Sequence, residues 1–505
     1  GIWMNTQRPE WNDANNALAG HGLSMVTLYQ LRDYASWCLG LVESLGDGEV
    51  SLSSVAAAWM EQTTRTLVDA IESVASKGSF DDKQRWELVS ALGRVAESAR
   101  SALAAGGLGE RHAVSLSAVA EFFRRTRELC DHSIERAKRE DGLYESYRVM
   151  HIGEGRAGVE SLFPMLEGQV SVLASGVLDE ARSIELLETL FASKLYREDQ
   201  HTFILYPRVD LPPLLDRNRG VEEAVLASPV LAAALERPDA QLVSRDAEGV
   251  IRFNADLTTR DALRERLESL AQRDDWAALV AEDNGRAWQA YERTFRHAQF
   301  TGRSGTMHKY EGLGSVYWHM VSKLLLAVQE TVLRASDRGA PAEQVETLLS
   351  YYRRVRDGLG FRKSPREFGA VPFEPYSHTP WGMGAQQPGM TGQVKEGVLA
   401  RFGEVGVRLA DGTIRFDATL IDPSECLGGE AALALSADPV PAGAIGCTVC
   451  GVPVTVRFGD ADQITITDAK GSARTIDSRD LPSADAASVF ARSGEIGSIG
   501  VVLGR

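Results

Sequence analysis

The residues best suited to bond-breaking chemistry lie in one short stretch near the start of the chain. They are Arg8, Glu10, Trp11, Asn12 and Asp13. Arginine, asparagine and carboxylate groups hydrogen-bond sugar hydroxyls, an aromatic face covers the C–H side of a pyranose, and a carboxyl group can protonate a leaving oxygen. The stretch is therefore typical of a sugar site. The alternative is that Asn12 or Asp13 caps the helix expected to follow.

A second concentration of polar residues and glycines lies between residues 298 and 320. Glycines let the backbone approach a ligand, and the charged side chains among them could bind an anion or act as acid and base. These side chains are Arg303, His308, Lys309 and Glu311. In the structural alternative the glycines form a tight entry to a helix. In either case we expect Tyr317 and Trp318 to lie in the core.

A third concentration is a loop rich in proline and glycine that runs from residue 372 into a helix beginning near Thr391. The free N–H groups of a helix N-terminus, beside a hydroxyl group, form an anion site. The alternative is a rigid connector. The candidate residues are Glu374, Tyr376, His378, Gln386, Gln387, Thr391 and Gly392.

Helices must position these residues, because apolar side chains recur at three- and four-residue spacing from about residue 22 to 410. We expect a mainly α domain of paired antiparallel helices. Long loops at 142–182, 197–220, 298–313 and 359–393 separate them, and loops of that length are usually functional. The expected helices span 22–44, 51–78, 81–105, 115–141, 183–196, 258–272, 275–297, 314–335 and 341–357.

The pattern changes near residue 408. Residues 407–416 read as a hairpin, with Asp411-Gly412 as its turn, and further short β runs follow. We therefore expect a helical domain over residues 1–408 and a C-terminal β domain, a sandwich or jelly roll, over 409–505. The further runs are 431–435, 447–458, 463–467 and 498–503.

Composition limits the classes of partner. The chain has 505 residues and a formal net charge of −16, which disfavours binding to nucleic acid. Neither a membrane-spanning run nor a signal peptide is present, and five scattered cysteines argue against a disulfide framework. We therefore expect a cytoplasmic protein. The start Gly-Ile-Trp, so close to a dense polar motif, favours the later part of a longer or processed protein.

With these motifs the chain resembles the inverting glycoside phosphorylases, the family of cellobiose and chitobiose phosphorylases, and more broadly the six-hairpin glycosidases. In that family a Trp-Asn-Asp segment carries the proton donor, a role that the resemblance gives to Asp13. The family also has a Pro-Tyr element, which Pro375-Tyr376 resembles. A Thr-Gly step opens its last barrel helix and helps to bind phosphate, as Thr391-Gly392 would here. The resemblance implies an (α/α)6 toroid followed by a small β domain.

The implied reaction is a single displacement at an anomeric carbon, with Asp13 as general acid. With phosphate as nucleophile no protein base is needed. With water, a carboxylate must activate it from about 6.5–9.5 Å away, and Glu311 or Glu374 would serve. Phosphate is a co-substrate in the first case, and no other cofactor is implied. The phosphate ligands would be Arg303, His308, His378, Thr391 and Gly392. The substrate ligands would be Arg8, Glu10, Trp11, Asn12, Tyr376, Gln386 and Gln387.

Other functions stay open at this point. A helical toroid that binds glycans, or serves as a scaffold, would keep the aromatic and asparagine contacts without needing the acid. A lyase or epimerase would need a base near the sugar C5, for which His308, Tyr310 and Tyr376 are candidates. A metal site has little support, because the nine histidines show no HxxxH-type pairing. The expected partners are an oligosaccharide and, if the toroid is incomplete, a second chain or domain.

Overall fold

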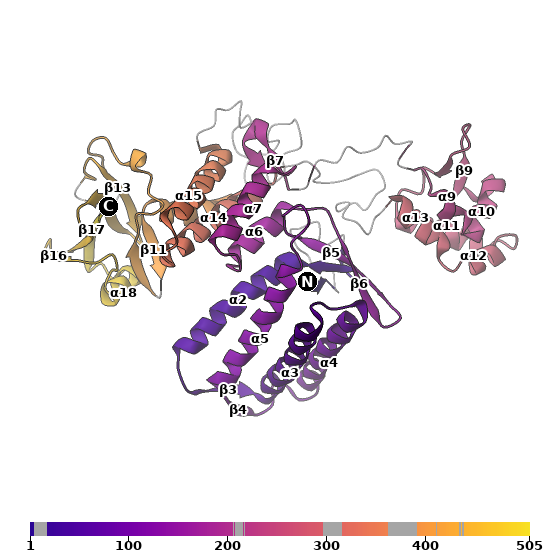
Figure 1. Cartoon of the computed structure of the whole chain (residues 1–505), viewed down its shortest axis with the longest axis horizontal. Coiled ribbons are helices and arrows are strands. Elements are labelled where there is room, and N and C mark those ends of the chain that lie inside the picture. Colours follow the sequence, from indigo (N-terminus) through magenta and orange to yellow (C-terminus); the bar gives the residue numbers. More distant parts are fainter. Residues whose placement is uncertain are drawn as a thin grey trace.

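The computed structural model describes residues 1–4, 18–205, 207, 216, 218–295, 316–361, 391–410, 412–433, 436 and 439–504. Helices dominate this part of the chain, so the mainly α prediction is confirmed. Figure 1 shows three bodies: a central helical group, a small helical body at one end, and a β unit containing the C-terminus at the other. No helix of the described residues is long and apolar enough to cross a membrane.

Four long helices form the first part of the central group, close to their predicted ranges. Each begins at a residue whose side chain accepts a hydrogen bond from a backbone N–H of the first turn, as N-caps do. Asp81 and Gln84 form a reciprocal capping box. Helix α2 packs on α5, and α3 packs on both α4 and α5. The helices are α2 (Met25–Ser44), α3 (Ser54–Lys77), α4 (Asp82–Gly106) and α5 (Leu116–Glu135).

A four-stranded antiparallel sheet lies beside these helices, in the order β1-β2-β5-β6. Its last two strands and α6 occupy the stretch predicted as a long loop at 142–182. A second pair of strands, β3 and β4, joins the far ends of the helices. The strands are β1 (Ile2–Met4), β2 (Gly22–Ser24), β3 (Glu49–Ser53), β4 (Arg111–Ser115), β5 (Tyr147–Gly153) and β6 (Arg156–Ser161).

Helix α14 (Trp318–Asp337) is the centre of the second part of the group. It packs on α6, α15 and α17, and it contributes Trp318 to the largest hydrophobic core. Tyr317 and Trp318 are both buried, as predicted. The other elements are α6 (Leu166–Ala174), α7 (Glu180–Ala192), β7 (Tyr196–Arg197), η1 (Glu198–Gln200), β8 (Thr202–Phe203), α15 (Ala342–Arg356), η3 (Asp357–Phe361) and α17 (Thr391–Glu404).

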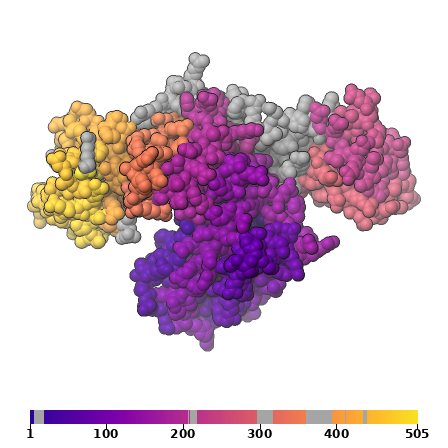
Figure 2. All heavy atoms as spheres, in the orientation of Figure 1, coloured from indigo at the N-terminus to yellow at the C-terminus, as the bar shows by residue number. Residues whose placement is uncertain are grey.

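Residues 218–295 form the small helical body, with a hydrophobic core of their own around Trp276, Phe253 and Tyr291. They lie inside the range that the sequence assigned to one helical domain. The helix predicted at 275–297 is divided by the left-handed Asn284 and Gly285. The elements are α9 (Glu222–Leu226), α10 (Pro229–Glu236), η2 (Pro238–Ala240), β9 (Val243–Arg245), β10 (Ile251–Phe253), α11 (Arg260–Ala271), α12 (Ala277–Asp283) and α13 (Arg286–Phe295). Figure 2 shows this body and the β unit at opposite ends of the molecule.

The C-terminal β unit contains the predicted hairpin and a five-stranded sheet in the order β13-β14-β17-β15-β16. Strands β14 and β17 run parallel, and the hairpin shares one hydrophobic core with the sheet. Residues 431–435 were expected to form a strand; of these, the described residues 431–433 contribute an isolated bridge from Ala431 to Val440. The sandwich or jelly roll and the toroid stay predictions. The elements are β11 (Val407–Ala410), β12 (Thr413–Phe416), η4 (Pro423–Glu425), β13 (Ala444–Val449), β14 (Val452–Gly459), β15 (Gln463–Asp468), β16 (Ala473–Ile476), α18 (Ser483–Ala491) and β17 (Ile496–Gly504).

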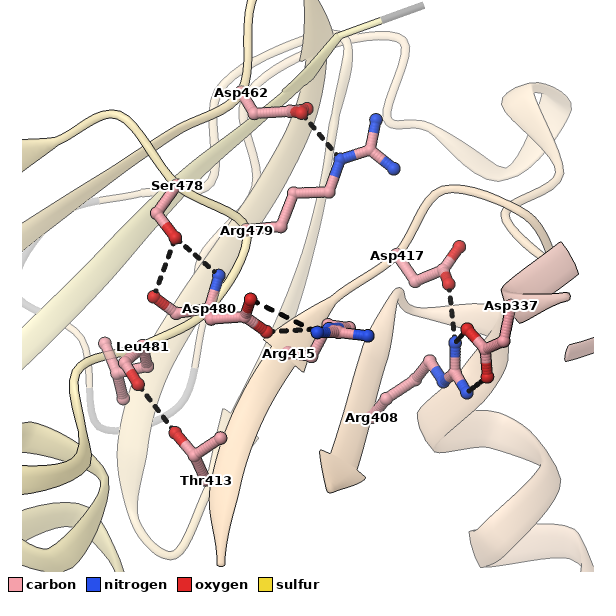
Figure 3. A network of polar contacts seen from close by, with 10 residues as sticks. All are labelled: Asp337, Arg408, Thr413, Arg415, Asp417, Asp462, Ser478, Arg479, Asp480 and Leu481. Carbon is pink, nitrogen blue, oxygen red and sulfur yellow. Dashed lines mark hydrogen bonds and ion pairs between the residues drawn. The ribbon is translucent and has the colours of Figure 1, made fainter. Parts of the chain in front are cut away.

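An ion-pair network joins the β unit to the end of α14 (Figure 3). Both terminal nitrogens of Arg408 bind the carboxylate of Asp337, at 2.9 and 2.7 Å, and Nη1 also binds Asp417 Oδ2 at 2.9 Å. These carboxylates, Asp337 foremost, raise the pKa of Arg408. The guanidinium therefore stays charged and holds the hairpin against α14.

Gly358 fixes how closely η3 approaches the β7–β8 turn. A Cβ atom at this position would overlap the carbonyl oxygen of His201, which sits in the left-handed region at φ 49°. Because backbone has to move to make room, Gly358→Ala is expected to lower the free energy of unfolding by about 1–3 kcal/mol. Urea denaturation would measure it. Gly40→Ala is the control: nothing lies within 4 Å of that Cβ in α2, so alanine there should stabilise by about 0.5–1 kcal/mol. Equal effects would contradict the prediction.

Candidate functional site

Of the predicted site residues, Thr391 and Gly392 lie within the described part of the chain, where they begin α17. The others lie outside it, and their roles stay predictions. They are Arg8, Glu10, Trp11, Asn12, Asp13, Arg303, His308, Glu311, Glu374, Tyr376, His378, Gln386 and Gln387. The described part of the candidate site consists of the elements that flank the three stretches in the sequence: residues 5–17, 296–315 and 362–390.

The described residues on either side of the stretch that carries Asp13 belong to the four-stranded sheet or are bonded to it. The N–H of Gly20 donates to the carbonyl oxygen of Met4 at 2.5 Å, and Met4 pairs with Gly22 across β1 and β2. Strand β2 continues the sheet, since Ser24 pairs with Tyr147 of β5. Met4 and Gly20, which flank this stretch among the described residues, are thus held together at this sheet.

The other two stretches end at the starts of α14 and α17, and one polar contact joins those helices. His319 Nε2 lies 3.2 Å from Glu396 Oε1. The hydroxyl of Tyr317 is 3.4 Å from His319 Nδ1. This arrangement fits a neutral ring that donates from Nε2 to the carboxylate and accepts at Nδ1. It fixes the start of α14, where residues 296–315 end, against the second turn of α17.

A line of buried polar groups runs from this contact back to the sheet. Glu167 of α6 is 2% exposed and accepts a hydrogen bond from the hydroxyl of Tyr147 at 2.7 Å. Lys323 lies one turn beyond His319 on α14, and the charges of both Glu396 and Glu167 act on its ammonium group. The structure thereby brings the sheet, α6, α14 and α17 to one place. We call Tyr147, Glu167, His319, Lys323 and Glu396 the polar cluster.

Burial controls the charges of the polar cluster. It lowers the pKa of Lys323, and Glu396 and Glu167 oppose that shift. For His319, burial and then Lys323 lower the pKa, against the opposing effect of Glu396. Burial would raise the pKa of Glu396, but a backbone hydrogen bond and His319 bring it below its usual value. Glu396 is therefore ionised at neutral pH.

Positively charged groups lie near the start of α17, within and beside the polar cluster. Lys323 and Lys395 place two ammonium groups near the N-terminal turns of α17, whose backbone N–H groups carry the positive end of the helix dipole. Glu396 is 2% exposed, and its Oε2 has no hydrogen-bond partner within the described ranges. Among those same residues, no group of three side chains is arranged to hold a metal ion.

Sequence reasoning missed most of the polar cluster. It gave His319 no role and did not select Glu167, Lys323 or Glu396. One local signal was present: His319 and Lys323 are four residues apart on an otherwise apolar helix, and so share a face. Glu167 and Glu396 carry no comparable signal, because a glutamate in a helix is ordinarily exposed.

The pKa of His319 predicts a loss of stability on mild acidification. It lies below the 6.5 of an unfolded histidine, so the unfolded chain takes up the proton first. The stabilisation is complete above pH 6.5 and is lost as the pH falls from there through the folded pKa. We expect Tm to fall between pH 7 and pH 5, and to fall less in His319→Gln. Thermal unfolding would measure this, with the exposed His112→Gln as control. An unchanged slope in His319→Gln would contradict it.

Comparison with known proteins finds a similarity that covers the small helical body. Residues 211–298 match the family model described as GH149 phosphorylase insertion domain 2. None of the curated proteins matches the chain. The match supports a relationship between this chain and the GH149 glycoside phosphorylases, and it points to a carbohydrate-active enzyme.

Proposed function

We propose that the protein is an inverting glycoside phosphorylase that cleaves an oligosaccharide with inorganic phosphate. The observation that carries the proposal is the match of residues 211–298 to an insertion domain of GH149 phosphorylases. The start of α17 gives further support, because its free N–H groups, with Lys323 and Lys395 nearby, suit an anionic nucleophile. A cytoplasmic location and a toroid completed by another chain or domain belong to the same proposal.

In the proposed reaction a phosphate oxygen attacks the anomeric carbon from the face opposite the glycosidic bond. The bond between that carbon and the glycosidic oxygen breaks, and Asp13 gives its proton to the departing oxygen. The products are a sugar 1-phosphate of inverted configuration and a shortened oligosaccharide. Single displacement needs no covalent intermediate, so one acid and one held anion are sufficient.

The residues divide into two groups in this proposal. The sugar would be bound by the first stretch and the 372–390 loop, and the phosphate by the start of α17 with its neighbours. The sugar ligands are Arg8, Glu10, Trp11, Asn12, Tyr376, Gln386 and Gln387. The phosphate ligands are Arg303, His308, His378, Thr391 and Gly392. The polar cluster would fix the position of α17, through the contact of Glu396 with His319.

Hydrolysis is the competing outcome, and it would need Glu311 or Glu374 as the base. The described carboxylates of the polar cluster do not suit that role as they stand. Glu167 accepts from Tyr147, and Glu396 accepts from His319. Each of these carboxylates already accepts a hydrogen bond from a neighbouring side chain. The proposal therefore favours phosphate over water.

The test is to incubate the protein with α- and β-linked gluco-oligosaccharides, with and without phosphate, and to measure sugar 1-phosphate and free sugar. Sugar 1-phosphate that forms only with phosphate is the expected result. Free sugar released regardless of phosphate would overturn the proposal in favour of a hydrolase. Sugar binding by calorimetry without any product would leave a glycan-binding protein.

A further inference from the structure

We propose that Glu425, in the C-terminal β unit, positions helix α17 and thereby the anion-binding start of that helix. That the start of α17 binds phosphate rests on the proposed function. That Glu425 fixes the position of the helix does not. The inference assigns the β unit a role in phosphate binding, although none of the five residues of the polar cluster comes from that unit.

Glu425 is one of four charged residues that alternate in sign at the end of α17. Arg356 donates to one carboxylate oxygen of Glu425, and Arg401 Nη1 donates to the other at 2.5 Å. The same two arginines bind Glu404: Arg356 Nε at 2.9 Å to Oε1, and Arg401 Nη1 at 2.9 Å to Oε2. We call these four residues the ion clamp.

The ion clamp is largely buried. Arg356 and Glu404 are 6% and 5% exposed, and Glu425 keeps 16% of its side chain in solvent. The hydroxyl of Tyr352 also donates to Glu404 Oε1 at 2.7 Å. Two positive and two negative charges balance, so removal of one carboxylate leaves an unbalanced cation in a poorly hydrated place. Arg401, the most exposed member, would then turn towards solvent.

Besides a hydrogen bond of 3.4 Å from Gln329 Nε2 to the carbonyl oxygen of Leu399, charged side chains hold helix α17 at two points. One is the contact of Glu396 with His319, and the other is the ion clamp at Glu404. The points are eight residues apart, which is about 12 Å at 1.5 Å per residue. Thr391 lies five residues, about 7 Å, beyond the first point. If the clamp loosens, the helix can pivot about Glu396, and its start moves.

Glu425 is the member of the ion clamp that the β unit contributes, and the unit has a second, separate attachment. Arg408 binds Asp337 at the end of α14, as Figure 3 shows. A substitution at Glu425 therefore leaves the β unit docked and changes the hold on α17. The effect on the anion site can thus be separated from the loss of the β unit.

The experiment compares Glu425→Gln with wild type in the full chain. The KM for phosphate is expected to rise about tenfold, because a misplacement of about 1 Å can cost up to a hundredfold. The kcat and the KM for the oligosaccharide should change less than twofold. Glu425→Asp, which keeps the carboxylate, should recover part of the affinity for phosphate. The matched control is Asp462→Asn, since Asp462 pairs with Arg479 within the β unit at 2.7 Å.

A second measurement does not depend on activity. Amide hydrogen exchange in the first turns of α17 should be faster in Glu425→Gln than in Asp462→Asn. An unchanged KM for phosphate with unchanged exchange would overturn the inference, and so would equal effects of the two variants. If the wild type forms no sugar 1-phosphate, the proposed function fails, and exchange alone decides whether Glu425 positions α17.

Discussion

Asp13→Asn is expected to lower kcat for sugar 1-phosphate formation by about 10²–10⁴-fold, which is the usual contribution of a general acid. The departing oxygen of a sugar is a poor leaving group unless it is protonated as the bond breaks. An amide has the size of the carboxyl group but no acidic proton that it could transfer to the departing oxygen. The KM for the oligosaccharide should change little, since asparagine can still hydrogen-bond a hydroxyl. Steady-state assays with saturating phosphate measure both constants.

The control for this variant is Asp274→Asn, an exposed aspartate in the small helical body. It makes the same change from a carboxyl group to an amide, and it should leave kcat within twofold of wild type. Full activity in Asp13→Asn would show that Asp13 is not the general acid. Equal losses in both variants would indicate an effect on folding and not on proton transfer.

Arg356→Ala is expected to lower the free energy of unfolding by about 3–5 kcal/mol. Breaking a buried ion pair by removing one partner has a cost of this size, because the remaining charge is left without compensation. Here the remaining charges are Glu404 and Glu425, which Arg356 joins across α15, α17 and η4. Urea denaturation followed by circular dichroism at pH 7 would measure the loss.

The matched control is Arg353→Ala on the same helix. Arg353 pairs with Glu346 at 3.1 Å, but both side chains are largely exposed, and such pairs contribute about 0–1 kcal/mol. The two variants remove the same side chain from the same helix and differ in burial. Similar losses from both would show that the ion clamp is not what makes Arg356 important.

Local patterns in the sequence predicted the helices well, for a physical reason. In α2 and α3 the buried residues recur at helical spacing, and serine residues cap the first turns. The C-terminal hairpin was equally local, since Asp411-Gly412 separates two strands that pair with each other. The short helices α6, α9, α10 and α18 were missed, because five to nine residues with an apolar run fit a strand as well as a helix.

The sheet beside the first helices could not be predicted in this way. Strand β2 has three residues, and its partner β5 begins more than a hundred residues later. Three residues are too few to show an alternating pattern, and no local signal records a pairing over such a distance. The stretch from 142 to 182 therefore resembled a loop until its strands were placed against β2.

The sequence by itself determined the local units of this protein: where helices begin and end, where the β unit starts, and which short stretches concentrate the groups that sugar chemistry requires. Only the tertiary structure decided which of these meet. Lys323, for example, lies near the charges of Glu167 and Glu396, which come from helices far apart in the sequence. Burial and the charge of distant neighbours set the pKa of such a group, and both are products of packing.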